Sequence, residues 1–271
     1  MHKISSYKND SKVNKKTIFF RNDDPDIFTF GDKREMLFML TDLFIEKRIP
    51  LVHAVIPGII TQKTVKYFNE LNQDTDLLEF IQHGWKHIKY EKGEFDYSRT
   101  AMKQLQDIRN GRNRMLKIFG DRFFAAFSAP YGTYSENTFK ILDNERFKVI
   151  SSVKRYEIKN RMFNEIGRLF NRTVFFGRRI SYHGGSVAGL KLKEISISVN
   201  IMQKDFPFKL LDRKAFFDKI RFAFGYTKNV GILLHHSNLK IEQLTLLDRY
   251  LDELKDYGFR FCKMSSIYES L

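Results

Sequence analysis

The sequence predicts an α/β fold built on a mainly parallel sheet or barrel. Short apolar runs alternate with segments of helical periodicity along the chain, as in βαβ units. Turn-forming residues close many of the apolar runs, among them Pro25, Pro57 and Pro130. The chain has 271 residues, of which 42% are hydrophobic, so it can bury the core of one large α/β domain or of two small ones.

The first half of the chain begins with a polar leader at residues 1–16, and a single domain is expected from 17 to 271. Asp32 is an N-cap candidate for the first helix, Pro50 ends that helix, and Gly120 closes a long amphipathic one. The expected elements are a strand at 17–24, a helix at 32–47, a strand at 51–56, a short helix at 64–71, a helix or strand at 77–82, a helix at 98–119, a strand at 123–127, a helix at 135–144 and a strand at 147–153.

The alternation of strand and helix patterns is interrupted in the second half of the chain. Residues 155–210 carry β-type runs and glycine-containing turns, so this region is expected to be a β-rich insertion that decorates the site. Regular order then resumes, with a helix at 211–224, a strand at 230–234, a helix at 241–257 and a short strand at 258–262.

Composition narrows the classes of function. The formal charge of +15 would favour nucleic acid, anionic lipid or anionic sugar nucleotides as partners, but the basic residues are spread along the chain and no nucleic-acid motif is present. A single cysteine, Cys262, excludes an internal disulfide and a cysteine-based zinc site. The sequence contains neither a membrane span nor the apolar centre of a secretory signal, so a cytoplasmic protein is expected.

Polar side chains stand where several expected strands end. Asp23 and Asp24 follow the first strand, and His83, Ser128 and His235 follow three others. Functional groups of parallel α/β folds gather beyond the carboxyl ends of the strands. We therefore expect these residues to share one cleft.

The chemistry of these residues indicates a metal site. Two adjacent carboxylates repel each other unless a cation or a proton relieves them. His83 and His87 are four residues apart, which would put both rings on one side of a helical segment. Two histidines and one carboxylate form a recurrent open set for a catalytic divalent cation. One aspartate could complete that set while the other remains free as a base.

Four motifs in order resemble the polysaccharide deacetylases, the NodB-homology group that is similar to carbohydrate esterase family 4. They are Asp23-Asp24, His83-Gly84-Trp85-Lys86-His87, Ala129-Pro130-Tyr131-Gly132 and Leu233-Leu234-His235. The resemblance covers about residues 17–262, with 155–210 unmatched, and the chain would be a divergent member. It implies a distorted (β/α) barrel of about seven parallel strands.

The resemblance also implies a role for each matched residue. Asp24, His83 and His87 would hold a divalent metal, most readily Zn²⁺. Asp23 would be the base that deprotonates the attacking water, and His235 the acid that protonates the departing amine. The backbone N–H of Tyr131 would stabilise the oxyanion.

Three of the motifs depart from the family pattern. Ser128 stands where an arginine usually pairs with the catalytic base, His236 stands where an aspartate usually follows the histidine, and Arg21-Asn22 replaces a small apolar pair. Arg21 could supply the missing charge. The candidates for substrate contact are Trp85, Pro130, Arg21 and His236.

The expected function is metal-dependent hydrolysis of an N-acetyl group on a sugar, such as a nucleotide- or lipid-linked glycan precursor. The alternatives are a catalytically impaired metal- or sugar-binding module of the same fold and, ranked lower, a basic nucleic-acid-binding protein. An N-acetylated sugar is thus the expected partner; nucleic acid is not expected.

Overall fold

A curled parallel sheet forms the centre of the computed structural model, which describes residues 16–26, 34–71, 76–203 and 208–271. The strands run in the order β8-β5-β4-β3-β2-β1-β10-β9, with β11 beside β1, and every pairing in this sheet is parallel. The strands are β1 (Thr17–Asp23), β2 (Leu51–Val55), β3 (Leu78–His83), β4 (Phe123–Ser128), β5 (Val149–Ile150), β8 (Lys193–Glu194), β9 (Ile197–Asn200), β10 (Asn229–Leu234) and β11 (Arg260–Phe261).

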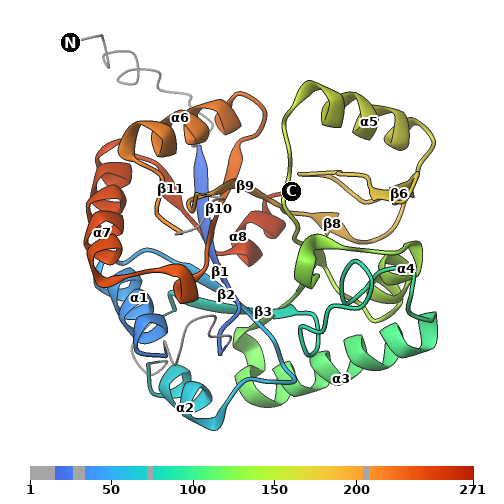
Figure 1. Ribbon diagram of the computed structural model, residues 1–271, viewed down its shortest axis with the longest axis horizontal. Coiled ribbons are helices and arrows are strands. Elements are labelled where there is room, and N and C mark those ends of the chain that lie inside the picture. The colour runs from blue at the N-terminus through green and yellow to red at the C-terminus, as the bar shows by residue number, and fades with distance from the viewer. Residues whose placement is uncertain (1–15, 27–33, 72–75, 204–207) are drawn as a thin grey trace.

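Helices surround these strands, as Figure 1 shows, so the expected α/β fold with a distorted (β/α) barrel is confirmed, the sheet being curled into a half-barrel. They are α1 (Arg34–Glu46), α2 (Gln62–Glu70), α3 (Ala101–Phe119), α4 (Glu136–Asn144), α5 (Ile158–Leu169), α6 (Arg213–Phe224), α7 (Ile241–Asp256) and α8 (Met264–Glu269). Short 3-10 turns occur at η2 (Gly120–Arg122), η3 (Pro130–Gly132) and η4 (His236–Asn238). None of the helices in the described ranges is both long and apolar enough to cross a bilayer.

The sheet separates two hydrophobic cores. Along β1, Ile18 and Phe20 pack outward against the surrounding helices, whereas Phe19 points into the barrel. Met264 and Ile267 of α8 belong to the inner core, and Glu79 on β3 accepts the backbone N–H of Met264. Helix α8 therefore fills the barrel near the start of β3. The carboxyl ends of the strands, at the opposite end, are not covered by it and can form a functional site.

Residues 155–210, expected as an insertion, divide into two parts. The first part lies outside the barrel and comprises α5 and the antiparallel hairpin of β6 (Val174–Phe175) and β7 (Arg178–Arg179). The second part belongs to the sheet, because β8 pairs with β5 and β9 pairs with β10. Residues 193–200 thus run from one edge of the curled sheet to the other, which raises the strand number above the expected seven.

The boundaries of individual elements differ from expectation for local reasons. The segment 77–82 is a strand, and the strand expected at 147–153 is reduced to Val149–Ile150. Helix α3 begins three residues late because the Thr100 side chain accepts the N–H of Lys103 as its N-cap. The Asp32 cap and residues 1–15 of the expected leader lie outside the described residues.

Candidate metal centre

The two aspartates at the end of β1 both reach the cleft because the backbone turns between them. Asp23 is the last strand residue and lies on the inner face with Phe19 and Arg21, where it is buried. Asp24 has a φ of 64°, a left-handed conformation that aspartate tolerates better than most residues. Asp26 then accepts bonds from the backbone N–H of Thr61 (2.7 Å) and the hydroxyl of Thr64 (2.7 Å), which ties this turn to the start of α2.

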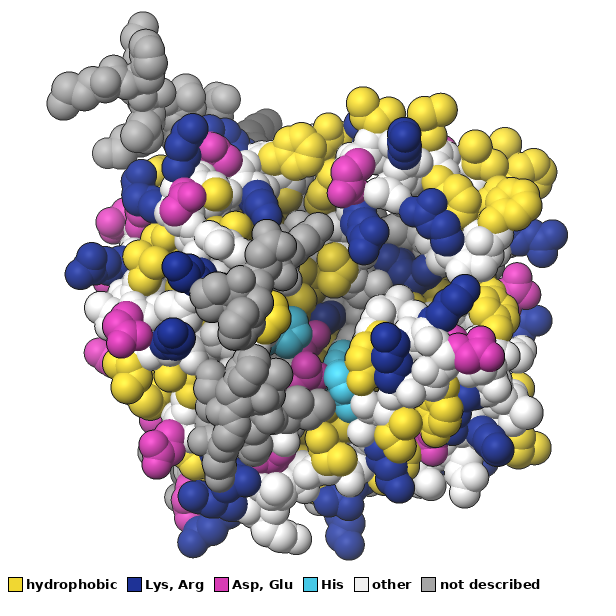
Figure 2. Space-filling view, in the orientation of Figure 1, with side chains coloured by type: hydrophobic (Ala, Val, Ile, Leu, Met, Phe, Trp, Pro, Cys, Tyr) yellow, Lys and Arg dark blue, Asp and Glu magenta, His cyan; other side chains and the backbone are white. Residues whose placement is uncertain are grey.

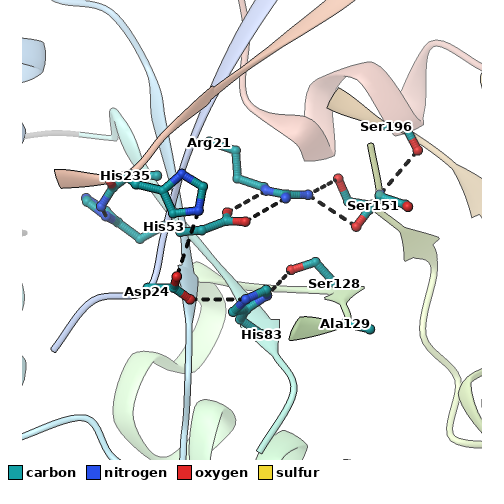
Figure 3. A network of polar contacts seen from close by, with 12 residues as sticks. Arg21, Asp24, His53, His83, Ser128, Ala129, Ser151, Ser196 and His235 are labelled. Atoms are coloured by element: carbon teal, nitrogen blue, oxygen red, sulfur yellow. Dashed lines mark hydrogen bonds and ion pairs between the residues drawn. The ribbon is translucent and has the colours of Figure 1, made fainter. Parts of the chain in front are cut away.

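Three ligand-type side chains converge at this turn, and Figure 3 labels two of them, Asp24 and His83. The Oδ1 atom of Asp24 lies 3.1 Å from Nε2 of His83 and 3.3 Å from Nε2 of His87. Ligand atoms of all three residues lie within 4.8 Å of one another. These distances make Asp24, His83 and His87 a candidate metal site, as the sequence predicted.

The second nitrogen of each imidazole contacts a hydroxyl group. Nδ1 of His83 lies 2.6 Å from Oγ of Ser128, and Nδ1 of His87 lies 3.1 Å from the hydroxyl of Tyr131. That hydroxyl also donates to the carbonyl oxygen of His87, so it is placed to accept from Nδ1–H. Such contacts fix the orientation of each ring, with Nε2 facing Asp24. Ser128 is the last residue of β4, and Tyr131 lies in the turn η3 that follows it.

The donor set fits a divalent cation. Among the described residues, none makes a hydrogen bond of good geometry to the buried Oδ1 of Asp24, although two imidazole nitrogens face it. Burial by itself would raise the pKa of Asp24, but the close contact with His83 and the charges of three histidines outweigh it and hold the pKa below its usual range. The carboxylate is therefore ionised near neutrality, and a negative oxygen beside two imidazoles suits zinc-like cations.

His87 reaches the site from a loop, because residues 84–87 are not helical as the spacing had suggested. The buried carboxylate of Glu94 organises this loop by accepting the backbone N–H groups of Trp85 (3.1 Å), Lys86 (2.7 Å) and His87 (3.3 Å). His87 itself has a φ of 58°. Nothing in the local sequence pattern around Glu94 indicates these contacts, so the sequence did not predict its role.

Glycine is required where the loop leaves β3. Gly84 has a φ of 57°, and a Cβ there would lie 2.1 Å from Oε2 of Glu94 and 2.6 Å from Cδ of Pro130. Pro130 is buried against this loop and supports it beneath the metal ligands. Its expected contact with substrate stays a prediction. Trp85 is half-buried, and its carbonyl oxygen accepts the N–H of Gly58.

Arg21 contacts both carboxylate oxygens of Asp23, Nε to Oδ1 at 2.6 Å and Nη2 to Oδ2 at 2.7 Å. Its remaining nitrogen, Nη1, donates to Oγ of Ser151 at 2.8 Å. Arg21 is buried inside the barrel, directly below Asp23 on the same strand. The guanidinium therefore stands where the resemblance required an arginine partner for Asp23, whereas Ser128 turns to His83.

The two adjacent histidines after β10 point to opposite sides of the sheet. The His235 side chain is 24% exposed, and its Nε2 lies 3.8 Å from Oδ2 of Asp24, across the cleft from His83. His236 is fully buried, and its backbone N–H and Nδ1 contact the side-chain amide of Asn22. The expectation that His236 contacts substrate is thus corrected, because in the turn after β10 its side chain faces the core and Asn22.

The candidate site opens at the surface. In Figure 2, histidine and acidic side chains lie together at the bottom of a central hollow between the helices. Tyr131 is exposed beside this hollow with a φ of 61°. A ligand can therefore approach Asp24 and His235 from solvent.

Comparison with known proteins supports the same fold. No family model matches the chain, and no curated protein matches its sequence. A structure from Mycobacterium smegmatis classed as a polysaccharide deacetylase superposes with a TM-score of 0.62 at 13% identity, covering 97% of this chain and 92% of that one.

Two further structures agree. A Streptococcus mutans CE4 esterase gives a TM-score of 0.57 at 13% identity over 92% of this chain and 86% of that one. A family 4 acetyl xylan esterase from Clostridium thermocellum, solved with a cobalt ion, gives 0.55 at 12% identity over 94% and 91%. The chain therefore has the fold of the carbohydrate esterase family 4 polysaccharide deacetylases and esterases.

Proposed function

We propose that this protein hydrolyses an N-acetyl group on a sugar with the help of a divalent metal ion. The observation that carries the proposal is the arrangement of the cleft. Asp24, His83 and His87 form one cluster, the neighbouring Asp23 is buried in a salt bridge with Arg21, and Nε2 of His235 lies 3.8 Å from Asp24.

Asp24, His83 and His87 would hold the metal, and Zn²⁺ is the cation that this donor set favours. When bound, such a cation acts as a Lewis acid that polarises the acetyl carbonyl and makes water nucleophilic near neutral pH. The protein's own side chains and backbone would carry out the proton transfers and stabilise the oxyanion.

Asp23 would accept the proton that the attacking water loses as its oxygen bonds to the acetyl carbon. Arg21 holds both carboxylate oxygens, and each oxygen retains a further lone pair for the proton. The bidentate contact keeps the carboxylate in one orientation, which general base catalysis requires.

His235 would complete the reaction from the other side of the cleft. As the C–N bond breaks, an imidazolium proton passes to the departing nitrogen, which leaves as an amine while the acetyl group leaves as acetate. An amine is a poor leaving group without this proton, and the pKa of histidine suits a donor near neutrality. The backbone N–H of Tyr131 would stabilise the oxyanion, a contact that is typically worth about 3 kcal/mol.

The proposed substrate is a nucleotide- or lipid-linked sugar precursor of a glycan, handled in the cytoplasm. The charge of +15 supports this choice because it favours association with phosphate groups. A neutral polymer would gain nothing from that charge.

The test is acetate release by the purified chain from N-acetylglucosamine, from its nucleoside diphosphate conjugate and from neutral chitin oligomers. We expect metal-dependent release that is fastest on the phosphate-bearing sugar and lost after treatment with a chelator. Stoichiometric metal without release from any N-acetyl sugar would instead identify the impaired binding module. Release from chitin alone would contradict the proposed substrate class.

A further inference from the structure

Helix α5 turns its hydrophobic stripe toward solvent. Ile158, Met162, Ile166 and Leu169 follow spacings of four, four and three residues, which place them in one stripe. Their side chains are 73%, 61%, 45% and 82% exposed, respectively. An ordinary surface helix buries such a stripe against the core, so α5 is inverted.

The buried face of α5 shows that this orientation is built into the fold. The buried residues on the helix are Asn164 and Gly167. Asn164 accepts the backbone N–H of Ser181 at 3.0 Å, and a Cβ on Gly167 would lie 2.2 Å from Cδ1 of Ile180. Only a small residue and a hydrogen-bonding one fit against the chain there. The apolar stripe is therefore held outward by specific contacts.

The stripe continues onto the β6–β7 hairpin. Phe170 and Phe176 are 59% and 85% exposed, and both rings contact Phe175. The α5 patch is defined here as Ile158, Met162, Ile166, Leu169, Phe170 and Phe176. Figure 2 shows hydrophobic side chains gathered over α5, on the face that also carries the hollow with the histidines. One continuous apolar surface thus lies on the same face as the candidate site.

Basic residues accompany the α5 patch. Residues 154–179 contain eight Lys and Arg side chains but only Glu157 and Glu165 as acids. The exposed basic side chains are those of Arg155, Lys159, Arg161, Arg172 and Arg178. Surfaces that bind proteins carry many different charge patterns, so the basic residues do not by themselves indicate a protein partner. An apolar helical stripe flanked by Lys and Arg is instead the pattern that complements an anionic lipid surface.

We propose that the α5 patch docks the protein on an anionic lipid bilayer, with the apolar side chains inserted among the acyl chains and the basic ones at the headgroups. Docking through this patch would keep the mouth of the candidate site close to the membrane. A sugar carried on a lipid phosphate would then reach the cleft without leaving the bilayer. Only this last step rests on the proposed function.

The test is co-sedimentation of the full chain with vesicles of phosphatidylcholine mixed with phosphatidylglycerol. The triple variant Met162→Ser, Leu169→Ser, Phe176→Ser should reduce the partition coefficient by a factor on the order of ten or more, because three inserted apolar side chains are lost. Its matched control, Met102→Ser with Ile241→Ser, removes residues that are 73% and 63% exposed on α3 and α7 and should bind like the parent. Vesicles of phosphatidylcholine alone should bind the parent less.

Equal binding by the α5 triple variant would overturn the proposal, and so would failure of the parent to bind the anionic vesicles. A concentration-dependent dimer in sedimentation velocity that only the α5 variant abolishes, without vesicle binding, would identify a self-association surface instead. Acetate release from a water-soluble sugar nucleotide, measured on the same variants, separates the docking surface from the proposed chemistry, because the α5 variants should leave it unchanged.

Discussion

Two polar networks lie back to back on opposite faces of the same strand ends. The inner network joins Asp24 and His83 to Ser128 and opens to solvent. The outer network joins Asn22 to His53, and His53 to Thr41 of α1, and is fully buried. Both contain imidazoles with polar partners, yet only the inner one brings ionisable groups together beside solvent.

Strand alternation decides which network a residue joins. Asp23 points inward and Asn22 outward, and His235 and His236 divide in the same way. A shift of one residue in β1 or β10 would exchange the ligand-type residues for the core ones. The comparison teaches that histidines of similar chemistry become a site or a core according to the side of the sheet that they face.

The largest expected effect separates the networks by metal binding. Asp24→Ala or His83→Ala should abolish stoichiometric zinc retention, because each removes one of three ligands. His53→Gln, in the outer network, should retain zinc at the level of the parent. Metal analysis after gel filtration measures both. A His83→Ala protein that keeps one zinc per chain would contradict the ligand assignment.

The next effect falls on turnover. Asp23→Asn should bind zinc normally yet lower acetate release by about 10²–10⁴-fold, the range for loss of a general base. The amide cannot accept the proton but still occupies the place beside Arg21. Near-normal release from the variant would exclude Asp23 as the base. Circular dichroism controls for folding.

A smaller effect is expected from the hydroxyl behind His83. Ser128→Ala removes the contact to Nδ1 and should weaken zinc affinity by about 10–100-fold, as is usual for groups that orient a metal ligand. Ser198→Ala, whose hydroxyl contacts Tyr156 on the far side of the barrel wall, is the matched control and should not alter affinity. Competition with a chromogenic chelator measures the change, and equal affinities would show that Ser128 does not orient the ring.

The smallest effect concerns pH and the outer network. Burial, with a lesser contribution from the charge of His236, lowers the pKa of His53 from 6.5 to about 3. Between those values the unfolded chain binds one more proton, so the free energy of unfolding falls as the pH falls, by at most about 1.4 kcal/mol per pH unit from this residue.

His53→Gln should therefore flatten the dependence of the free energy of unfolding on pH between about 6 and 4. Urea denaturation at several pH values measures the slope, which is independent of the variant's overall stability. An unchanged slope would mean that His53 is not held neutral in the folded protein.

Much of the fold and of the candidate centre could be predicted from the sequence. Alternating strand and helix patterns gave the parallel sheet, and polar residues at strand ends gave Asp24, His83 and His235 as neighbours, because parallel strands finish at one edge. These features depend on short-range periodicity. The sequence could also suggest Arg21 as the partner of Asp23, since two residues along a strand share one face.

The remaining features depend on contacts between distant segments. Ser128 approaches His83 across 45 residues, and Arg21 approaches Ser151 across 130. Glu94 matters only because a loop with left-handed residues brings three N–H groups to it. No local sequence pattern encodes such long-range contacts. For this reason the family pattern suggested that the residue at position 128 pairs with Asp23, whereas Ser128 contacts His83.

The sequence by itself determined near which residues most strands end, which residue types stand there and that two histidines and an aspartate could bind a metal. Only the tertiary structure decided that Arg21 holds Asp23, that His236 is buried and that α5 presents its apolar stripe to solvent. The physical reason is that alternation and composition are local properties. The partner of a side chain, and the face of a helix that is covered, are set by packing of the whole chain.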